Sequence, residues 1–120
     1  MAKTKLAVLF EVTPKSECKE EYLQLGAELK SELIKMPGFI SVERFASLNE
    51  EGKLLSLSFW DNEEAAAIWR NHEKHRESQK KGKNNLFEKY KISVAHVIRE
   101  YTKDDRDEAP SDSNISLNAK

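Results

Sequence analysis

The order of its apolar segments is the feature that most constrains what this chain can fold into. Two long stretches with helical periodicity separate short stretches that are rich in β-branched and aromatic residues. Two of these short stretches follow each other directly in the middle of the chain. This pattern predicts the order strand–helix–strand–strand–helix–strand. A chain of 120 residues is long enough for one such domain with one hydrophobic core.

The first half of the chain predicts a strand followed by a helix. Residues 5–12 are expected to form the strand, with apolar side chains on both faces: Leu6, Val8, Phe10 and Val12 on one, Ala7 and Leu9 on the other. Thr13 and Pro14 suit a helix start, and Pro37-Gly38 suits a helix end near Met36. Within this helix Cys18 begins an apolar stripe, so it is interpreted as a small core residue.

The second half predicts a hairpin, a helix and a last strand. Residues 39–48 and 53–60 are expected to pair as strands through the Gly-containing turn 49–52. A second helix is expected from Asp61 or Asn62 to about Lys81, and a last strand over 90–101. Residues 102–120 are charged and lack periodicity, so they are expected to form a flexible tail behind a domain that spans 1–101.

This order of elements is the ferredoxin-like βαββαβ pattern of an α+β fold. It places both helices on one face of a four-stranded antiparallel sheet. The other face is then uncovered, and its candidate residues are apolar. They are Ala7, Leu9, Ile40, Val42, Trp60, Ala95 and Val97. Because a large bare apolar face is a liability, we expect a homodimer in which a second sheet covers it.

Charge and cysteine content exclude several classes of protein. The net charge of −1 carries no basic excess of the kind that nucleic-acid-binding proteins use, so no nucleic-acid partner is expected. A single cysteine excludes an internal disulfide and a multi-cysteine metal site. The apolar run from Leu6 to Phe10 is too short for a signal sequence or a membrane span. A cytoplasmic protein without a membrane partner is therefore expected.

The predicted second helix carries the candidate site. Ala65, Ile68, His72, His75 and Gln79 recur at spacings of three and four, with Trp69 beside them. This face begins apolar and becomes polar halfway along. Its polar groups either point into a cavity or mark where the helix leaves the core, and the sequence leaves both alternatives open. His72 and His75 lack the His-Glu-x-x-His spacing, and His96 is the one other histidine, so no metal site is predicted.

Three stretches together resemble the antibiotic biosynthesis monooxygenase family. They are Phe59-Trp-Asp-Asn-Glu-Glu-Ala65, then Trp69-Arg-Asn-His-Glu-Lys-His75 with Gln79 and Gly82 behind it, then Tyr90-Lys-Ile-Ser-Val-Ala95 leading to Arg99-Glu-Tyr101. The likeness covers about residues 5–101. It implies a dimeric α+β barrel with a pocket between sheet and helices in each subunit.

The resemblance also implies a chemistry. Members oxygenate small electron-rich aromatic molecules such as quinols and anthrones with O2, often without metal, flavin or haem, so no cofactor is expected. Trp69 and His75 match the helix motif of the family, and His72 is a looser match, which makes these three the candidate catalytic residues. Two alternatives stay open: a non-enzymatic small-molecule-binding or stress-related dimeric module, and a haem-binding or haem-degrading protein. Gln79 stands where haem-degrading members carry their ligating histidine.

Overall fold

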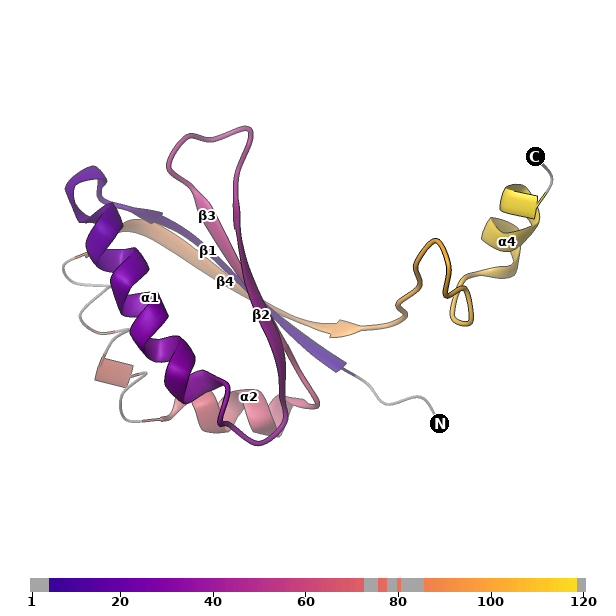
Figure 1. Ribbon diagram of the computed structural model, residues 1–120, viewed down its shortest axis with the longest axis horizontal. Helices are drawn as coiled ribbons and strands as arrows, with labels where there is room; N and C mark the ends of the chain where they lie inside the picture. Colours follow the sequence, from indigo (N-terminus) through magenta and orange to yellow (C-terminus); the bar gives the residue numbers. More distant parts are fainter. Residues whose placement is uncertain (1–4, 73–75, 78–79, 81–85, 119–120) are drawn as a thin grey trace.

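The computed structural model describes residues 5–72, 76–77, 80 and 86–118. In chain order the elements are β1 (Lys5–Pro14), the 3-10 turn η1 (Ser16–Cys18), α1 (Lys19–Leu33), β2 (Phe39–Ala46), β3 (Leu54–Trp60), α2 (Glu63–Arg70), β4 (Phe87–Val97) and α4 (Ser111–Asn118). Figure 1 shows this arrangement, with the C-terminal segment extending beyond the end of the sheet.

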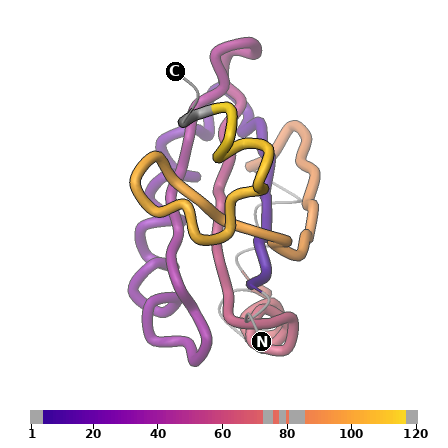
Figure 2. The backbone as a smooth tube through the Cα atoms, turned by 90° about the vertical axis from the view of Figure 1, so that its right-hand side faces the viewer, coloured from indigo at the N-terminus to yellow at the C-terminus, as the bar shows by residue number. Residues whose placement is uncertain are grey.

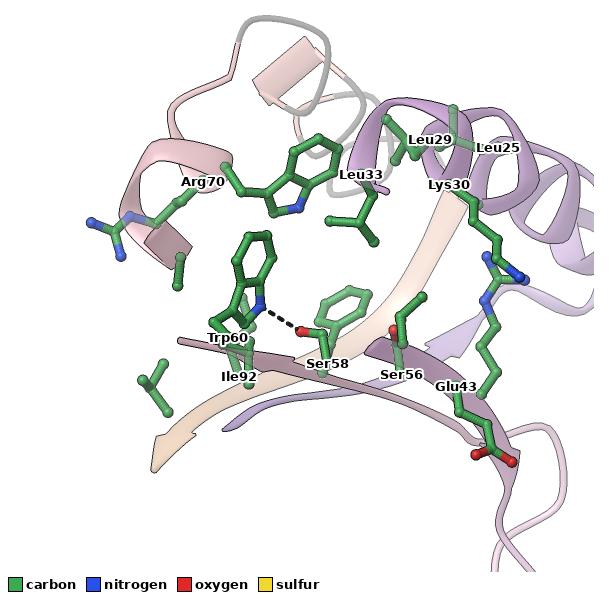
Figure 3. Close-up of a pocket in the computed structure, with 18 of the residues that line it drawn as sticks. Leu25, Leu29, Lys30, Leu33, Glu43, Ser56, Ser58, Trp60, Arg70 and Ile92 are labelled. Atoms are coloured by element: carbon green, nitrogen blue, oxygen red, sulfur yellow. Dashed lines mark hydrogen bonds between the residues drawn. The ribbon is translucent and has the colours of Figure 1, made fainter. Parts of the chain in front are cut away.

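The four strands form one sheet in the order β2-β3-β1-β4, and every neighbouring pair is antiparallel. Both α1 and α2 lie on the same face of this sheet, as Figure 3 shows. The predicted ferredoxin-like α+β architecture is therefore confirmed. Within the described part of the chain, none of the helices has the length and apolar character needed to cross a membrane.

The strand register corrects the predicted outer face of the sheet. Trp60 pairs with Leu6 and with Phe39, so it faces the helices, where it is 1% exposed. Val42 pairs with Ser58 on the same inner face, and Ile40 lies where the β2–β3 register shifts. The outer face instead combines the expected side chains of β1 and β4 with the apolar side chains of β3. These are Ala7, Leu9, Ala95 and Val97 with Leu55, Leu57 and Phe59.

Local chemistry sets the helix boundaries near the site. Gly38, at φ +82°, follows the end of α1, and its carbonyl accepts a 2.8 Å hydrogen bond from the Asp61 amide. Asn62 caps α2 by accepting a 2.8 Å bond from the Ala65 amide. The connection between α1 and β2 is thereby tied to the start of α2.

The second helix is shorter than predicted. It ends at Arg70, because Asn71 leaves helical geometry (φ −95°, ψ 0°) and its side-chain amide donates a 2.9 Å bond to the Ala67 carbonyl. Asparagine competes in this way for backbone groups and favours helix ends. Helical structure resumes at residues 76, 77 and 80. The prediction of one uninterrupted helix to about Lys81 is therefore wrong at Asn71 and His72, whereas His75 and Gln79 lie outside the described residues.

The core lies at the end of the sheet where α1 finishes and α2 begins. Its buried members are Leu6, Leu33, Trp60, Ala65 and Trp69. The Phe39 ring meets the Trp60 indole edge-on at 5.4 Å between centroids. The two indoles are the largest side chains of this cluster.

The residues that follow β4 bond mainly to one another. The Arg106 guanidinium donates to Ser113 (2.8 Å) and Asn114 (3.1 Å), and it lies 4.9 Å from the centroid of the Tyr101 ring. Figure 2 looks along the long axis of the molecule, with this segment in front of the sheet. The radius of gyration is 17.1 Å, against about 14 Å for a compact chain of this length. The flexibility expected of 102–120 stays a prediction.

Deleting residues 103–120 tests how far the tail supports the domain. We expect the free energy of unfolding to change by less than about 1 kcal/mol, because the described bonds of this segment are largely internal. Urea unfolding of the full chain and of the truncated chain measures the difference. A much larger loss of stability would mean that the segment docks on the domain or on another copy.

Ion pairs across the sheet predict the response to acid. Glu11 accepts from Lys53 (3.0 Å) and Lys91 (3.2 Å), and these bonds lower the pKa of its carboxyl. Bonds from Lys89 first, and from Lys53, likewise lower the pKa of Glu50. A lowered folded-state pKa contributes stability above the unfolded value of 4.5, and this contribution is lost as pH falls through the folded value.

We expect the melting temperature of Glu11→Gln to fall less between pH 5 and about pH 3 than that of the original chain. Equal acid sensitivity would show that Glu11 takes no part.

Candidate functional site

A cavity of about 660 Å³ lies between the inner face of the sheet and the two helices (Figure 3). This is within the range of pockets that take small organic ligands. The lining is predominantly apolar and comes from all four strands and both helices. The predicted pocket between sheet and helices is therefore present in a single copy of the chain.

The floor of the cavity is the inner face of the sheet. Rows of paired residues cross it, and each row brings side chains from several strands to one level. One row contains Ser58, Val8, Val94 and Val42, and the next contains Ser56, Phe10, Ile92 and Arg44. Ser56 and Ser58 point from this floor toward the helices in Figure 3. The Ser58 hydroxyl accepts a 3.0 Å bond from the Trp60 indole, which satisfies that buried N–H.

The opposite wall is α1, whose apolar stripe faces the cavity. Leu25, Leu29 and Leu33 follow at spacings of four, and all three line the cavity. This is the stripe that the sequence predicts. Its Leu33 belongs to the buried core, whereas Leu25 and Leu29 are half-buried beside the cavity.

Aromatic rings close the end of the cavity near the start of α1. The Phe87 ring lies 5.6 Å from Phe10 and 5.5 Å from Tyr22, measured between centroids. Tyr90 packs 5.9 Å from Phe10 on the same inner face. Burial raises the pKa of the Tyr22 hydroxyl, and the nearby Arg44 charge opposes that rise. The Tyr22 phenol is therefore neutral at physiological pH and can donate a hydrogen bond.

Of the predicted catalytic residues, Trp69 and His72 contact each other, but they differ in whether they reach the cavity. Trp69 lines the cavity and is 9% exposed. His72 stacks on Trp69, with ring centroids 5.5 Å apart and an interplanar angle of 24°, but it is not among the lining residues. Its Nδ1 is buried without a hydrogen-bond partner in the described part of the chain. His75 lies outside the described residues.

Charged residues contribute to the pocket lining at two places, beside α1 and β2 and at α2, where Glu63 and Arg70 lie, and they were not predicted from the sequence. Arg44 from β2 and Lys30 from α1 both contribute to the lining. Glu43 also contributes to the lining, but its carboxylate points away from the cavity in Figure 3. Arg70 contributes as well, and its guanidinium also points away from the cavity in Figure 3. The serines at alternate positions of β3 and the glycine inside α1 were the signals in the sequence for the side of the pocket beside α1 and β2.

Metal ligands do not gather within the described residues. No three histidine, cysteine, aspartate or glutamate side chains of that set lie close enough together to hold an ion. His96 is exposed on β4, and Cys18 precedes the first turn of α1.

Comparison with known proteins identifies relatives over most of the domain. The model of the antibiotic biosynthesis monooxygenase family matches residues 6–81. The jasmonate monooxygenase ABM of Pyricularia oryzae is 37% identical over 91 residues, which are 76% of this chain and 42% of that protein. The chain thus spans less than half the length of this relative. The uncharacterized protein YqjZ of Bacillus subtilis is 34% identical over 95 residues, 78% of this chain and 80% of that one.

Solved structures share the fold at low sequence identity. A protein of Mycobacterium tuberculosis superimposes with a TM-score of 0.73 at 14% identity, covering 82% of this chain and 99% of that one. A protein of Shewanella oneidensis also reaches 0.73 at 14% identity, with 80% and 93% covered. The fold, the pocket and the match over residues 6–81 agree, and the chain belongs to the antibiotic biosynthesis monooxygenase family.

Proposed function

We propose that this protein is a monooxygenase that oxidises a small electron-rich aromatic molecule of the quinol or anthrone type. The observation that carries the proposal is the apolar cavity of about 660 Å³, lined by two indoles and two serine hydroxyls, in a member of this family. Flat aromatic molecules stack on such rings, and an apolar pocket excludes water from a reactive intermediate.

A lone thiol, Cys18, suits a reducing compartment, so we place the activity in the cytoplasm.

The proposed reaction uses O2 as the oxidant and the substrate as the source of all electrons. For an anthrone, removal of a proton from the activated CH2 group leaves a carbanion, which reduces O2 and forms a carbon–oxygen bond as a hydroperoxide. Loss of the second C–H proton with cleavage of the O–O bond then gives a ketone and one water. The CH2 carbon gives up four electrons, two for each oxygen atom, so no external reductant is needed. The protein supplies a base, an orientation and a dry cavity.

We assign the base to His75, which the resemblance to the family indicates, and the stacking wall to Trp69. Histidine is the residue type that most often serves as a general base. His72 stacks on Trp69 without being among the lining residues, so its proposed role is to hold that indole in place. This position of His72 also favours a second candidate function, a binding module without turnover, because no histidine of the described set lines the cavity.

Two measurements separate these candidates. A thermal-shift screen of quinols, anthrones and jasmonate identifies ligands, and an oxygen electrode then measures uptake with each of them. We expect one O2 consumed for each molecule of anthrone converted. Ligand binding without oxygen uptake would favour the binding module. A Soret band on titration with haem would favour the haem-binding alternative.

His75→Ala tests the proposed base. We expect turnover to fall by something like 10²-fold, a common effect of removing a general base. The melting temperature should stay close to that of the original chain. His72→Ala should have a smaller effect on turnover, because His72 does not line the cavity. Full activity in folded His75→Ala would remove His75 from the mechanism.

Trp69→Ala tests the proposed wall of the pocket. We expect weaker binding together with a loss of about 3–5 kcal/mol of stability, because a buried ring is replaced by a void. Ile68→Ala is the matched control, since this neighbour on α2 is 51% exposed. Urea unfolding and ligand titration of both variants give the comparison. Unchanged binding in Trp69→Ala would place the substrate elsewhere.

We also propose a homodimer formed through the outer face of the sheet. The outer-face patch consists of Leu9, Leu55, Leu57 and Phe59, flanked by Phe45, which is 42% exposed. No helix of the described chain covers this patch, since α1 and α2 lie on the other face. A second sheet packed against it would bury these side chains.

Light scattering tests the dimer. We expect a mass twice the 13.8 kDa of one chain for the original protein. Leu57→Lys, at the centre of the outer-face patch, should shift the mass toward that of a single chain, because a charge would be buried between the sheets. Leu48→Lys is the control, since Leu48 is fully exposed in the β2–β3 turn. A single-chain mass for the original protein would contradict the proposal.

A further inference from the structure

Arg44 crosses from the edge strand β2 to helix α1 through a notch that a glycine provides. Its guanidinium carbon lies 5.7 Å from the centroid of the Tyr22 ring. A β-carbon at position 26 would overlap the Nη2 atom of this guanidinium, so the side chain occupies space that Gly26 leaves open. Tyr22, Gly26 and Lys30 follow at intervals of four on α1 and therefore lie along one side of the helix.

This arrangement brings two positive charges to the same side of the pocket. Lys30 is one turn beyond the notch that holds the Arg44 guanidinium, and both residues line the cavity. Within the described residues, neither side chain forms an ion pair with a carboxylate. The ion pairs described there join other lysines to Glu11, Glu50 and Glu100.

Two carboxylates belong to the pocket lining, Glu43 and Glu63, and within the described residues neither forms an ion pair with Arg44 or Lys30. Glu63 lies in the first turn of α2. Glu43 precedes Arg44, and successive residues of a strand point to opposite faces of a sheet. Glu43 pairs with Leu57 of the outer face, and Figure 3 shows its carboxylate directed away from the cavity. Two like charges on one side of an apolar pocket repel each other, and an anion between them offsets that repulsion.

We propose that the pocket takes a flat apolar molecule that carries one carboxylate, and that Arg44, assisted by Lys30, binds this carboxylate. A guanidinium donates two parallel hydrogen bonds to a carboxylate, which fixes the orientation of the ligand as well as its charge. Tyr22, whose ring lies 5.7 Å from the Arg44 guanidinium carbon, and Ser56, which pairs with Arg44 across the strands, also line the cavity and carry hydroxyls that can donate to the same group. The apolar body then extends along the leucine stripe of α1 toward Trp60 and Trp69.

This inference deepens the proposed function and rests on it, since it names the substrate class of the same pocket. It also differs from a purely structural role for Arg44, in which the guanidinium merely stacks on Tyr22. A structural role predicts loss of stability without loss of charge selectivity. An anchoring role predicts the reverse, because both cations are exposed side chains at the side of the pocket.

Titration of two matched probes tests the proposal. The probes are 9-anthracenecarboxylate and its uncharged methyl ester, and fluorescence at pH 7 in low salt measures the binding of each. We expect the carboxylate to bind about 10- to 100-fold more tightly than the ester, as for a hydrogen bond to a charged group. Added salt should reduce this preference, because the site is partly exposed.

Three variants assign the preference to its residues. Arg44→Gln should abolish it while leaving the binding of the ester unchanged. Gly26→Ala should reduce it as well, because the new β-carbon displaces the guanidinium, while its melting temperature should not fall, since alanine favours a helix over glycine. Arg99→Gln is the charge-matched control, as Arg99 lies beyond β4 and outside the pocket lining, and it should keep the full preference.

Several outcomes would overturn the assignment. Equal affinity for the carboxylate and the ester in the original chain, or no binding of either probe, would contradict an anionic ligand in this pocket. An equal loss of preference in Arg99→Gln would show that overall charge, not Arg44, selects the carboxylate. Oxygen uptake is measured separately. The anthracene probes have no CH2 group to oxidise, so uptake is measured with anthrone and with an anthrone carboxylate. Charge-selective binding of the probes with no uptake on either anthrone refutes the monooxygenase proposal, whereas uptake with uncharged anthrone and no charge preference refutes the carboxylate anchor.

Discussion

The pocket depends on α1 being held at both ends and standing off from the sheet between them. At one end Leu33 packs with Leu6 and the indoles of Trp60 and Trp69. At the other end the Tyr22 ring meets Phe87, which in turn packs on Phe10 of the sheet. Aromatic side chains bury large apolar areas, so their packing at the two ends of α1 can hold the helix in place above the cavity. The space under the middle of the helix is therefore left for a ligand.

The sequence predicts the elements well and the faces of the sheet less well. Alternation in β1 places Leu6, Val8 and Phe10 on the inner face, as expected. In β3 the same rule puts Leu55, Leu57 and Phe59 together, but the sequence alone does not say which side of the sheet they occupy. Ser56 and Ser58 look like solvent-facing residues, whereas they line the cavity. A polar row is typical of a solvated face and equally of the floor of a pocket.

The candidate residues on the second helix show that periodicity alone does not predict where a side chain such as Asn71 ends the helix. Spacings of three and four place His72 on the face of Ala65 only if the helix continues beyond Arg70. A single side-chain bond from Asn71 to the Ala67 carbonyl accompanies the end of the helix, and His72 turns to stack on Trp69. Trp69, by contrast, lines the cavity, and its catalytic role stays a proposal. The large apolar ring of Trp69 is buried wherever the helix ends. The polar side chain of His72 has no such requirement, so its position depends on where the helix ends.

Gly26 connects stability to the proposed chemistry of the pocket. Glycine inside a helix costs about 1 kcal/mol relative to alanine, and Gly26 lies in the middle of α1. The notch that it leaves is filled by the Arg44 guanidinium, a flexible group that could lie elsewhere at little cost. Packing alone does not explain why α1 keeps the destabilising Gly26, because the Arg44 guanidinium that it accommodates could lie elsewhere. Gly26 is consistent with a site where some stability is given up so that a cation can stand beside an apolar cavity, which is the compromise expected where function and folding compete.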